Sequence, residues 1–544
     1  MDGLIMDRPL LISSLLEFGA RNHAGSEIVS RSVEGPIHRY TMADSHTRSK
    51  QLAQALTRLG VVAGDRIATL AWNGYRHFEL YFGVSGMGAI CHTINPRLFH
   101  EQVVYVINHA EDKYIFMDLT FVPLLEALEA HLPKVAGYVI MTDKAHMPET
   151  KLANVHCYED LLAAEDADYT WPEFDERTAS SLCYTSGTTG NPKGVLYSHR
   201  STVLHTFAVC AGGGAGPTSY SSYLALVPMF HVNAWGLPYA CAMTGAKLVL
   251  PGPRYEGDMI FDLMDEEKVD QSAGVPTLWL LLLGEMKKRG RKPQAFKTLV
   301  VGGSAFPASM IETYEDTYGI EIHHAWGMTE LSPIGTIGTL LPAMNSLPKE
   351  QRWAEKIKQG RAIYGVEKKI VDENGERVPE DGKAFGELLV RGPWTASAYF
   401  NDAEATAQSF TEDGWFRTGD ICTLDANGVM HIVDRSKDVI KSAGEWISSI
   451  DLENAAMAHP AIQECAVIGM PHPKWDERPL LVAVAAEGQS PVLEEVREFL
   501  SDKVAKWWLP DDMVILDELP HTATGKVSKL NLREQLKDYA FPGV

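Results

Sequence analysis

The sequence has few basic residues, and this limits the kinds of molecule that the protein can bind. Lys and Arg total 49 against 71 Asp and Glu among 544 residues, which gives a net charge of −22 at pH 7. An acidic surface repels phosphate backbones and anionic lipids, which argues against nucleic acid as a partner. A ligand rich in phosphate must therefore bind through a local group of basic side chains.

Clustered cysteines are also missing. The seven cysteines are scattered and include no C-x-x-C pair. This argues against a disulfide framework and a zinc site, and it fits a reducing compartment. The N-terminus carries Asp2 and Asp7 before any apolar run, unlike a signal peptide. We therefore expect a cytoplasmic protein.

No apolar run is long enough for a bilayer. The most apolar stretch, residues 223–250, has Lys247 as its only formal charge, but Pro228, Pro238 and Gly245 interrupt it. A membrane helix needs about twenty consecutive apolar residues. We expect a buried strand, turn and helix here, and no membrane insertion.

The spacing of apolar residues predicts layered α/β structure. Apolar positions at helical spacing predict a helix over residues 41–59. Apolar runs predict strands at 66–71, 113–117 and 180–184. Strands that alternate with helices are typical of sheets covered by helices.

Length and a change in composition predict two domains of unequal size. A chain of 544 residues is too long for one core. Residues 434–444 begin with four charges among five residues and continue with small ones, as an exposed joint does. We expect a large α/β domain at 1–434 and a small mobile α+β domain at 435–544.

Residues 184–194, YTSGTTGNPKG, combine three glycines, four hydroxyl side chains and Lys193. Backbone amides and hydroxyls of such a loop can wrap a polyphosphate while the lysine supplies positive charge. The loop follows the strand predicted at 180–184 and precedes a helix predicted near Ser201. Its spacing is not the Walker pattern. A plain surface turn is the alternative for a segment of this composition.

This segment and several later motifs occur in a known order. They are WGMTE (326–330), GELLVRGP (386–393), GWFRTGD (414–420), DRSKDVIKSAGEWIS (434–448) and TATGKVSK (522–529). Together the chain resembles the acyl-adenylate-forming superfamily over nearly its whole length. The resemblance implies an ATP-dependent acid–CoA ligase that makes acyl-CoA, AMP and pyrophosphate through an acyl-adenylate.

The resemblance also implies site residues. Thr185 and Glu330 would help hold Mg²⁺, Asp420 and Arg435 would bind ribose, and adenine would lie between Trp326 and the glycine pair 302–303. The full set implied for ATP and CoA is Thr185, Ser186, Gly187, Thr188, Thr189, Gly190, Lys193, Gly302, Gly303, His324, Ala325, Trp326, Thr329, Asp420, Arg435, Lys437, Gly444, Glu445 and Trp446.

Two lysines are implied for the two half-reactions. The Lys526 ammonium can touch the carboxylate and the α-phosphate together and draw two anions into line. Lys441 would replace it after the small domain turns about Lys437. Glu330 and His231 complete the predicted catalytic set.

The predicted acyl pocket contains His231, Trp235, Gly303, Trp326, Gly327 and Pro333. His231 has an alternative role as a hydrogen-bonded core histidine. Acetate-activating relatives carry a tryptophan at the position of Gly327, so glycine predicts room for a longer acid. Similarity within the superfamily implies 3-methylmercaptopropionate, an intermediate of dimethylsulfoniopropionate degradation, with a medium-chain fatty acid as the alternative.

Two other functions stay open. An adenylating enzyme could pass its acyl group to an acceptor other than CoA, and a silent paralogue would only bind. Lys193, Glu330, Asp420 and Lys526 are all present, which argues against the second. Family resemblance also implies a homodimer.

Overall fold

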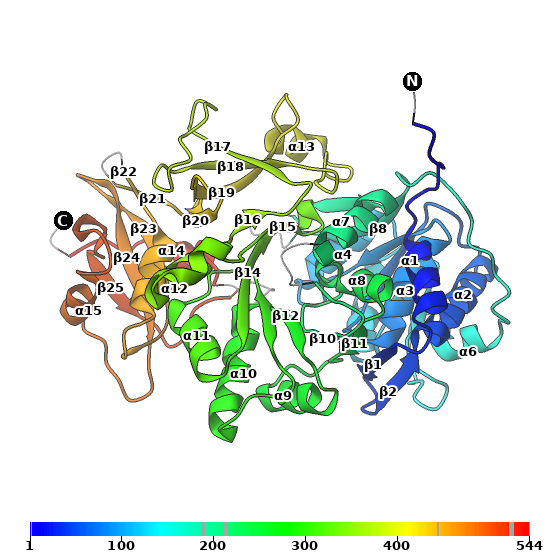
Figure 1. Cartoon of the computed structure of the whole chain (residues 1–544). Helices are drawn as coiled ribbons and strands as arrows, with labels where there is room; N and C mark the ends of the chain where they lie inside the picture. The colour runs from blue at the N-terminus through cyan, green and yellow to red at the C-terminus, as the bar shows by residue number, and fades with distance from the viewer. Residues whose placement is uncertain (2, 186–190, 212–215, 443–444, 522–526, 543–544) are drawn as a thin grey trace.

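The computed structural model of the chain describes residues 1, 3–185, 191–211, 216–442, 445–521 and 527–542. Its N-terminal part is built on two large sheets (Figure 1). The first has the spatial order β7 (Val155–Cys157), β6 (Gly137–Ile140), β5 (Tyr114–Met117), β3 (Arg66–Leu70), β4 (Ile90–Thr93), β8 (Ala179–Tyr184) and β9 (Gly194–Ser198).

The second sheet has nine strands. Their spatial order is β16 (Arg361–Ala362), β15 (Ile334–Ile337), β14 (Glu321–Gly327), β13 (Thr298–Val301), β12 (Gln271–Gly274), β10 (Ser222–Ala225), β11 (Lys247–Leu250), β1 (Glu27–Arg31) and β2 (Ile37–Thr41). Most neighbours in both sheets are parallel, and antiparallel strands lie at the edges. Parallel strands covered on both faces are mostly apolar, and β4, β5 and β6 are buried at every position, although β4 also carries His92 and Thr93.

Helices cover these sheets. They are α1 (Ile12–Asn22), α2 (Met42–Arg58), α3 (Tyr75–Gly86), α4 (His100–Ala110), α5 (Val122–Leu128), α6 (Tyr158–Ala163), α7 (His199–Ala211), α8 (Leu237–Thr244), α9 (Gly257–Glu266), α10 (Pro276–Arg289), α11 (Ala308–Glu312) and α12 (Lys349–Lys356). The helix expected at 41–59 is α2, whose start is fixed by a capping box of Thr41 and Asp44. The expected α/β layering is confirmed.

The C-terminal third forms two smaller sheets. One is antiparallel, with β17 (Glu367–Val371), β18 (Gly386–Arg391), β19 (Phe416–Leu424) and β20 (Met430–Arg435), and α13 (Ala403–Ser409) lies beside it. The other joins β21 (Ile440–Ser442), β22 (Glu445–Ile447), β23 (Ile462–His472), β24 (Asp476–Ala485) and β25 (Asp512–Ile515), with α14 (Ser449–Ala456), α15 (Leu493–Leu500) and α16 (Lys529–Gln535).

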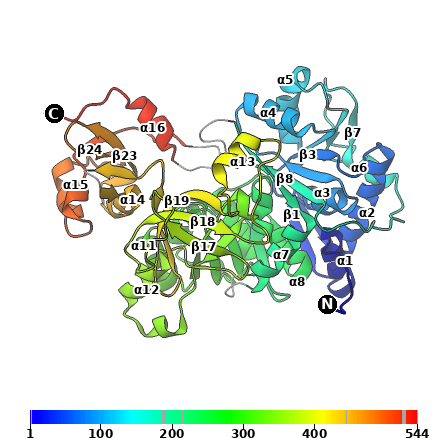
Figure 2. The same ribbon diagram turned by 90° about the horizontal axis from the view of Figure 1, so that it is seen from above.

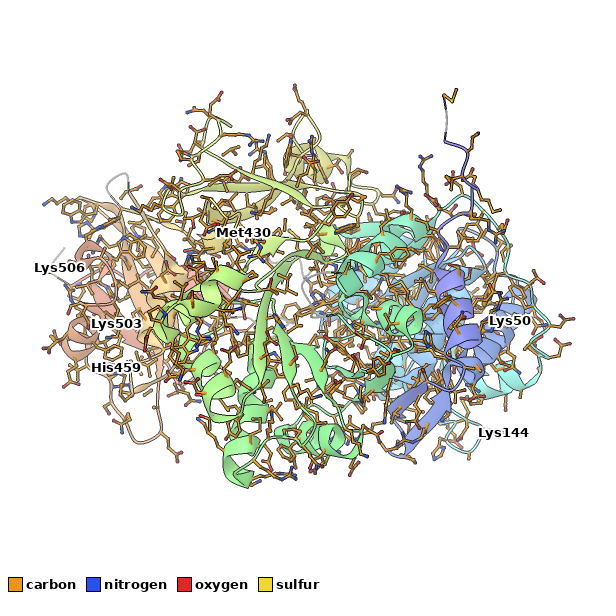
Figure 3. The ribbon with its side chains drawn as sticks, in the orientation of Figure 1. Lys50, Lys144, Met430, His459, Lys503 and Lys506 are labelled. Carbon is orange, nitrogen blue, oxygen red and sulfur yellow. The ribbon has the colours of Figure 1, made fainter. Side chains whose placement is uncertain are left out.

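The last sheet and its helices form a small unit at one end of the molecule. Figure 2 shows them in orange and red, opposite the blue and cyan strands of the first sheet. Lys503, Lys506 and His459 lie at that end in Figure 3, and Lys50 and Lys144 lie at the other. Met430 lies between them, and its amide donates to the Gly360 carbonyl oxygen at 2.7 Å. The chain thus has a large N-terminal and a small C-terminal domain, while the boundary at 434/435 stays a prediction.

The helix expected near Ser201 is confirmed as α7, which begins at His199, but strand β9 before it was not predicted. Strand β9 pairs antiparallel with β8, so the segment joins two neighbouring strands and does not open a helix. Sequence spacing could not reveal β9, because Gly194–Ser198 holds only two aliphatic residues and alternates imperfectly.

The apolar stretch at 223–250 folds as expected. It forms β10, a short 3-10 turn η3 (Val232–Gly236), helix α8 and β11. Across the part of the chain that the structure describes, no helix has the length and apolar character to cross a membrane.

Candidate active site

Residues near the two ends of the Gly/Thr segment are hydrogen-bonded to each other. The Thr185 amide donates to the Lys193 carbonyl oxygen at 2.9 Å, and the Lys193 amide donates to Thr185 Oγ1 at 3.1 Å. These bonds close the β8–β9 connection at its base. The residues between them that are implied for phosphate binding lie outside the described residues, namely Ser186, Gly187, Thr188, Thr189 and Gly190.

Tyr399 links Lys193 to Glu330. The Lys193 ammonium lies 4.9 Å from the centroid of the Tyr399 ring, and the Tyr399 hydroxyl donates to Glu330 Oε1 at 2.6 Å. Burial raises the pKa of Glu330, and the Tyr399 hydrogen bond and the charges of Arg435 and Lys193 oppose that rise. Thr185 and Glu330, the two predicted magnesium ligands, therefore belong to one connected group.

The segment at 396–400 was not predicted to belong to the site. Its Ala396 amide donates to the Glu330 carbonyl oxygen at 2.7 Å, and its Phe400 amide donates to the Gly194 carbonyl oxygen at 2.8 Å. It therefore joins the Glu330 turn to the start of β9, with Tyr399 between them. The segment 396–400, ASAYF, has no charge, glycine pair or ligand spacing to mark it.

Asp420 lies buried between Trp326 and Arg435. Trp326 Nε1 donates to Asp420 Oδ2 at 2.8 Å, and Arg435 Nε lies 2.9 Å from Asp420 Oδ1. Arg435 Nη1 also donates to the Thr418 carbonyl oxygen at 3.2 Å, which fixes the guanidinium. The structure thus brings together three residues that were predicted from separate motifs.

The glycine pair after β13 meets close neighbours. A Cβ on Gly302 would lie 3.0 Å from the Ala325 carbonyl oxygen and 3.0 Å from the Trp235 ring. Gly303 has a φ of 89°, in the left-handed region that favours glycine. Both positions therefore favour glycine, which also allows close approach to a flat ligand.

Strand β14 and the 3-10 turn η5 (Thr329–Leu331) carry the other predicted nucleotide residues. His324 is buried, and its Nδ1 lies 2.7 Å from the Ile357 carbonyl oxygen. Burial lowers the pKa of His324 to about 4. The Tyr197 hydroxyl donates to the Thr329 carbonyl oxygen at 2.6 Å. Both contacts fix the backbone on either side of Trp326.

A narrow apolar cavity of about 30 Å³ lies beside Trp235. Trp235 is the only member of the predicted acyl set among its lining residues. The sequence analysis missed the others because they look like ordinary core residues in strands and helices. They are Ala208, Val209, Tyr223, Leu237, Ala273, Val300, Ile334, Ile337 and Ile363.

Trp235 stands on a left-handed turn. The φ angles from Val232 to Trp235 lie between 47° and 55°. Each such residue costs about 1–2 kcal/mol, so the surroundings must offset several of them. Asn233 is buried and contributes, since its Nδ2 donates to Ser181 Oγ at 3.0 Å. The position of the Trp235 ring is therefore imposed by its surroundings.

The other predicted acyl residues lie elsewhere. A Cβ on Gly327 would lie 2.2 Å from the Pro333 carbonyl oxygen, so backbone already fills the space that the missing side chain was expected to open. The argument from Gly327 to a deeper pocket is therefore wrong. Pro333 precedes the cavity residue Ile334, and His231 lines a second cavity, of mixed polar and apolar lining, together with Thr185.

The predicted site residues of the small domain are not gathered at one place. Lys441 is half exposed, and its Nζ lies 3.8 Å from a carboxylate oxygen of Glu373, just beyond β17. It lies opposite Trp446 in the β21–β22 pair. Burial lowers the pKa of Lys437. The backbone of Glu445 begins β22, whereas Lys526 and Gly444 lie outside the described residues.

Models of two protein families match this chain. The model for AMP-binding enzymes matches residues 16–400, and the model for the AMP-binding enzyme C-terminal domain matches residues 451–526. The two matches fall on either side of the charged segment at 434–444. Glu330 and the Gly/Thr segment lie within the first match, whereas Asp420 lies between the two matches.

Individual proteins resemble it along its whole length. A 3-methylmercaptopropionyl-CoA ligase of Ruegeria lacuscaerulensis is 50% identical over 538 residues, 99% of each chain. A medium-chain-fatty-acid–CoA ligase of Ectopseudomonas oleovorans is 48% identical, over 99% of this chain and 98% of that one. The crystal structure of the anthranilate CoA ligase AuaEII with anthranoyl-AMP has a TM-score of 0.86 at 25% identity, covering 98% of each chain.

Proposed function

The chain belongs to the AMP-binding enzyme family and is an AMP-forming acid–CoA ligase, and we propose that its acid is 3-methylmercaptopropionate. The carboxylate attacks the α-phosphorus of ATP and releases pyrophosphate. The CoA thiol then attacks the acyl-adenylate, loses its proton and releases AMP. The first step turns a carboxylate oxygen, which is a poor leaving group, into part of AMP, and the second step displaces that AMP from the acyl carbon.

The 50% identity to two 3-methylmercaptopropionyl-CoA ligases, over nearly the whole chain, carries the choice of acid. The cavity beside Trp235 supports it, because narrow apolar walls suit a short unbranched chain. A thioether sulfur packs well against an aromatic ring, and Trp235 and Tyr223 both line the cavity.

The nucleotide site follows from the polar contacts. Asp420 keeps lone pairs on both oxygens beside its bonds to Trp326 and Arg435, so it can accept ribose hydroxyls. Glu330 and Thr185 offer the oxygen ligands that Mg²⁺ prefers beside substrate phosphates, so this pair fits the ion. When bound, Mg²⁺ would neutralise charge on those phosphates.

Lysine side chains then position the two anionic substrates, the carboxylate of the acid and the phosphates of ATP. Lys193 is held at the β8–β9 connection by the Tyr399 ring and brings positive charge to the phosphates. Lys526 aligns the carboxylate with the α-phosphate. Lys441 takes its place for the thioester step after a turn at Lys437. The exposed Lys441–Glu373 pair opposes this turn little, because exposed pairs contribute only about 0–1 kcal/mol.

Steady-state kinetics with a series of acids tests the proposal. We expect kcat/KM for 3-methylmercaptopropionate to exceed that for butyrate and hexanoate, with acetate and long chains poorer still. AMP release should require CoA. If octanoate exceeds the thioether acid about tenfold, the enzyme is a medium-chain ligase, as the 48% identical relative is named.

The acceptor, the oligomeric state and the cellular location each have a separate test. Adenylation that proceeds to product without CoA would identify another acceptor. Light scattering of the purified chain at two concentrations would test the proposed homodimer, and cell fractionation would test the cytoplasmic location.

A further inference from the structure

A second cavity lies between α4 and the seven-stranded sheet. Its lining includes His92 and Asn95 near the end of β4, Thr185 at the end of β8, and His231. The cavity measures about 10 Å³, which is room for about one water molecule. The cavity thus lies between His92 of the sheet and two residues of the proposed site, Thr185 and His231.

His92 brings a buried polar pair to this cavity. Both His92 and Asp112 are fully buried, and His92 Nδ1 lies 2.7 Å from Asp112 Oδ2. His92 Nε2 is buried as well and has no hydrogen-bond partner within the described part of the chain. An unmet polar atom of this kind destabilises a protein, so its retention beside a cavity that other polar side chains also line points to a ligand.

We propose that Asp112 and His92 form a positioning dyad that holds one water molecule against Thr185 and His231. The proposal rests on the proposed function, because it assigns the two residues to the adenylation site. His92 itself touches no substrate and acts through the water.

Hydrogen-bond polarity sets the arrangement. Asp112 accepts the proton on Nδ1, so Nε2 is left as an acceptor. A water there donates one hydrogen to Nε2 and keeps its other hydrogen and its lone pairs for Asn95, Thr185 and His231. Buried waters make about three such bonds, and the polar residues of the lining can supply them. The water would fix the orientation of Thr185 and His231 before substrate binds.

Asp112→Asn inverts this polarity without a change in volume. The amide donates to Nδ1, so the proton moves to Nε2, which then donates into the cavity. We expect kcat for pyrophosphate exchange to fall about tenfold while KM for ATP stays within about twofold, as for one misdirected hydrogen bond. Nitrogen-15 NMR of labelled histidine should show the His92 proton on Nδ1 in the parent and on Nε2 in the variant.

Asp118→Asn is the matched control. Asp118 is a buried carboxylate at the end of β5 that accepts the Trp72 amide at 2.7 Å, and it does not line the cavity. We expect its exchange rate to stay within about twofold of the parent. An equal loss in both variants would overturn the proposal.

The double variant His92→Leu/Asp112→Leu separates positioning from stability. Replacing both partners of a buried polar pair by apolar residues is often neutral for folding. We expect an unchanged or higher unfolding midpoint together with the same tenfold loss of kcat. Parent-like kcat would show that the dyad is only structural, and a parent proton on Nε2 would overturn the assignment. A parent that makes no acyl-CoA from any acid would refute the proposed function, while the NMR arm would still report on the dyad.

Discussion

The nucleotide side and the acyl side of the proposed site are built by different means. On the nucleotide side, Glu330, Asp420 and Arg435 are held by short polar contacts. On the acyl side, Trp235 and Ala273 face a cavity whose walls are nearly all apolar. Binding on the nucleotide side depends on individual polar contacts, whereas binding on the acyl side depends on the volume and shape of the cavity.

This difference predicts two kinds of mutant. Loss of a polar contact on the nucleotide side removes stabilisation that every acid shares, because every acid reacts with the same ATP. A change of volume on the acyl side alters the ratio between acids and leaves the nucleotide steps alone. The predictions below test this division, from the largest effect to the smallest.

Lys526→Ala should have the largest effect. One ammonium that touches both reacting anions is worth about 3–4 kcal/mol, so adenylation should fall by roughly 10²–10³-fold. The loss should be equal for 3-methylmercaptopropionate and hexanoate. Pyrophosphate exchange measures it, and CoA transfer from supplied acyl-adenylate should persist. Lys441→Ala is the matched control, with the loss in the second half-reaction only.

Tyr399→Phe tests the contact that sequence did not reveal. It removes the hydroxyl bound to Glu330 and keeps the ring beneath Lys193. A hydrogen bond to a charged group contributes about 1.5–3 kcal/mol, so kcat should fall about 10–100-fold for every acid.

The pH dependence of activity in Tyr399→Phe tests whether Glu330 must be ionised. Burial already raises the pKa of Glu330, and the Tyr399 bond opposes the rise. Without the hydroxyl the pKa rises further, so activity that needs ionised Glu330 is lost at a higher pH as the solution is acidified. An acid limb at the same pH in both proteins would show that Glu330 does not have to be ionised.

Sequence revealed the polar half of the site better than the apolar half. Asp420, Arg435 and Trp326 stand in separate motifs, and the structure joins them. Tyr399 escaped because an aromatic residue without a motif looks like core. The apolar lining escaped for the same reason, since a wall of a cavity and a core residue follow one apolar pattern. The argument from Gly327 failed because a sequence does not show which backbone fills the space beside a glycine.

Acid should weaken the acyl side through His205. His205 is fully buried, its Nε2 accepts the Ile334 amide at 3.2 Å, and burial lowers its pKa to about 3. Unfolded histidine has a pKa near 6.5, so the unfolded chain takes up this proton first. The folded state, in which His205 is neutral, therefore keeps its full stability above pH 6.5 and loses stability as the pH falls toward 3. Between pH 7 and pH 5, this one group should lower the free energy of unfolding by about 2 kcal/mol.

His205→Gln isolates that contribution. Glutamine keeps an acceptor for the Ile334 amide and does not titrate. Urea unfolding at pH 7 and at pH 5 should show a difference in unfolding free energy about 2 kcal/mol smaller than in the parent. An unchanged difference would mean that His205 is already protonated in the fold or shielded in the unfolded chain.

The smallest effect tests the acyl cavity itself. Ala273 and Val300 both line it, and they lie opposite each other in the β12–β13 pair. Ala273→Val adds two methyl groups to the wall, and each methylene of acid that is excluded costs about 0.8 kcal/mol. The ratio of kcat/KM for hexanoate to that for propionate should fall roughly tenfold, whereas Val300→Ala should raise it. KM for ATP should stay the same in both variants.

The exchange Ala273→Val/Val300→Ala is the control, because it conserves the total volume of the wall. Volume-conserving exchanges in a core cost little, so the double variant should fold normally and return the acid ratio to within about threefold of the parent. Gly327→Trp cannot serve this purpose, because its side chain would collide with the Pro333 carbonyl oxygen and disturb β14 and β15. If neither single variant moves the ratio, the cavity beside Trp235 does not hold the acyl chain. The acyl side would then have to be sought near His231, and the division between a polar and an apolar half would fail.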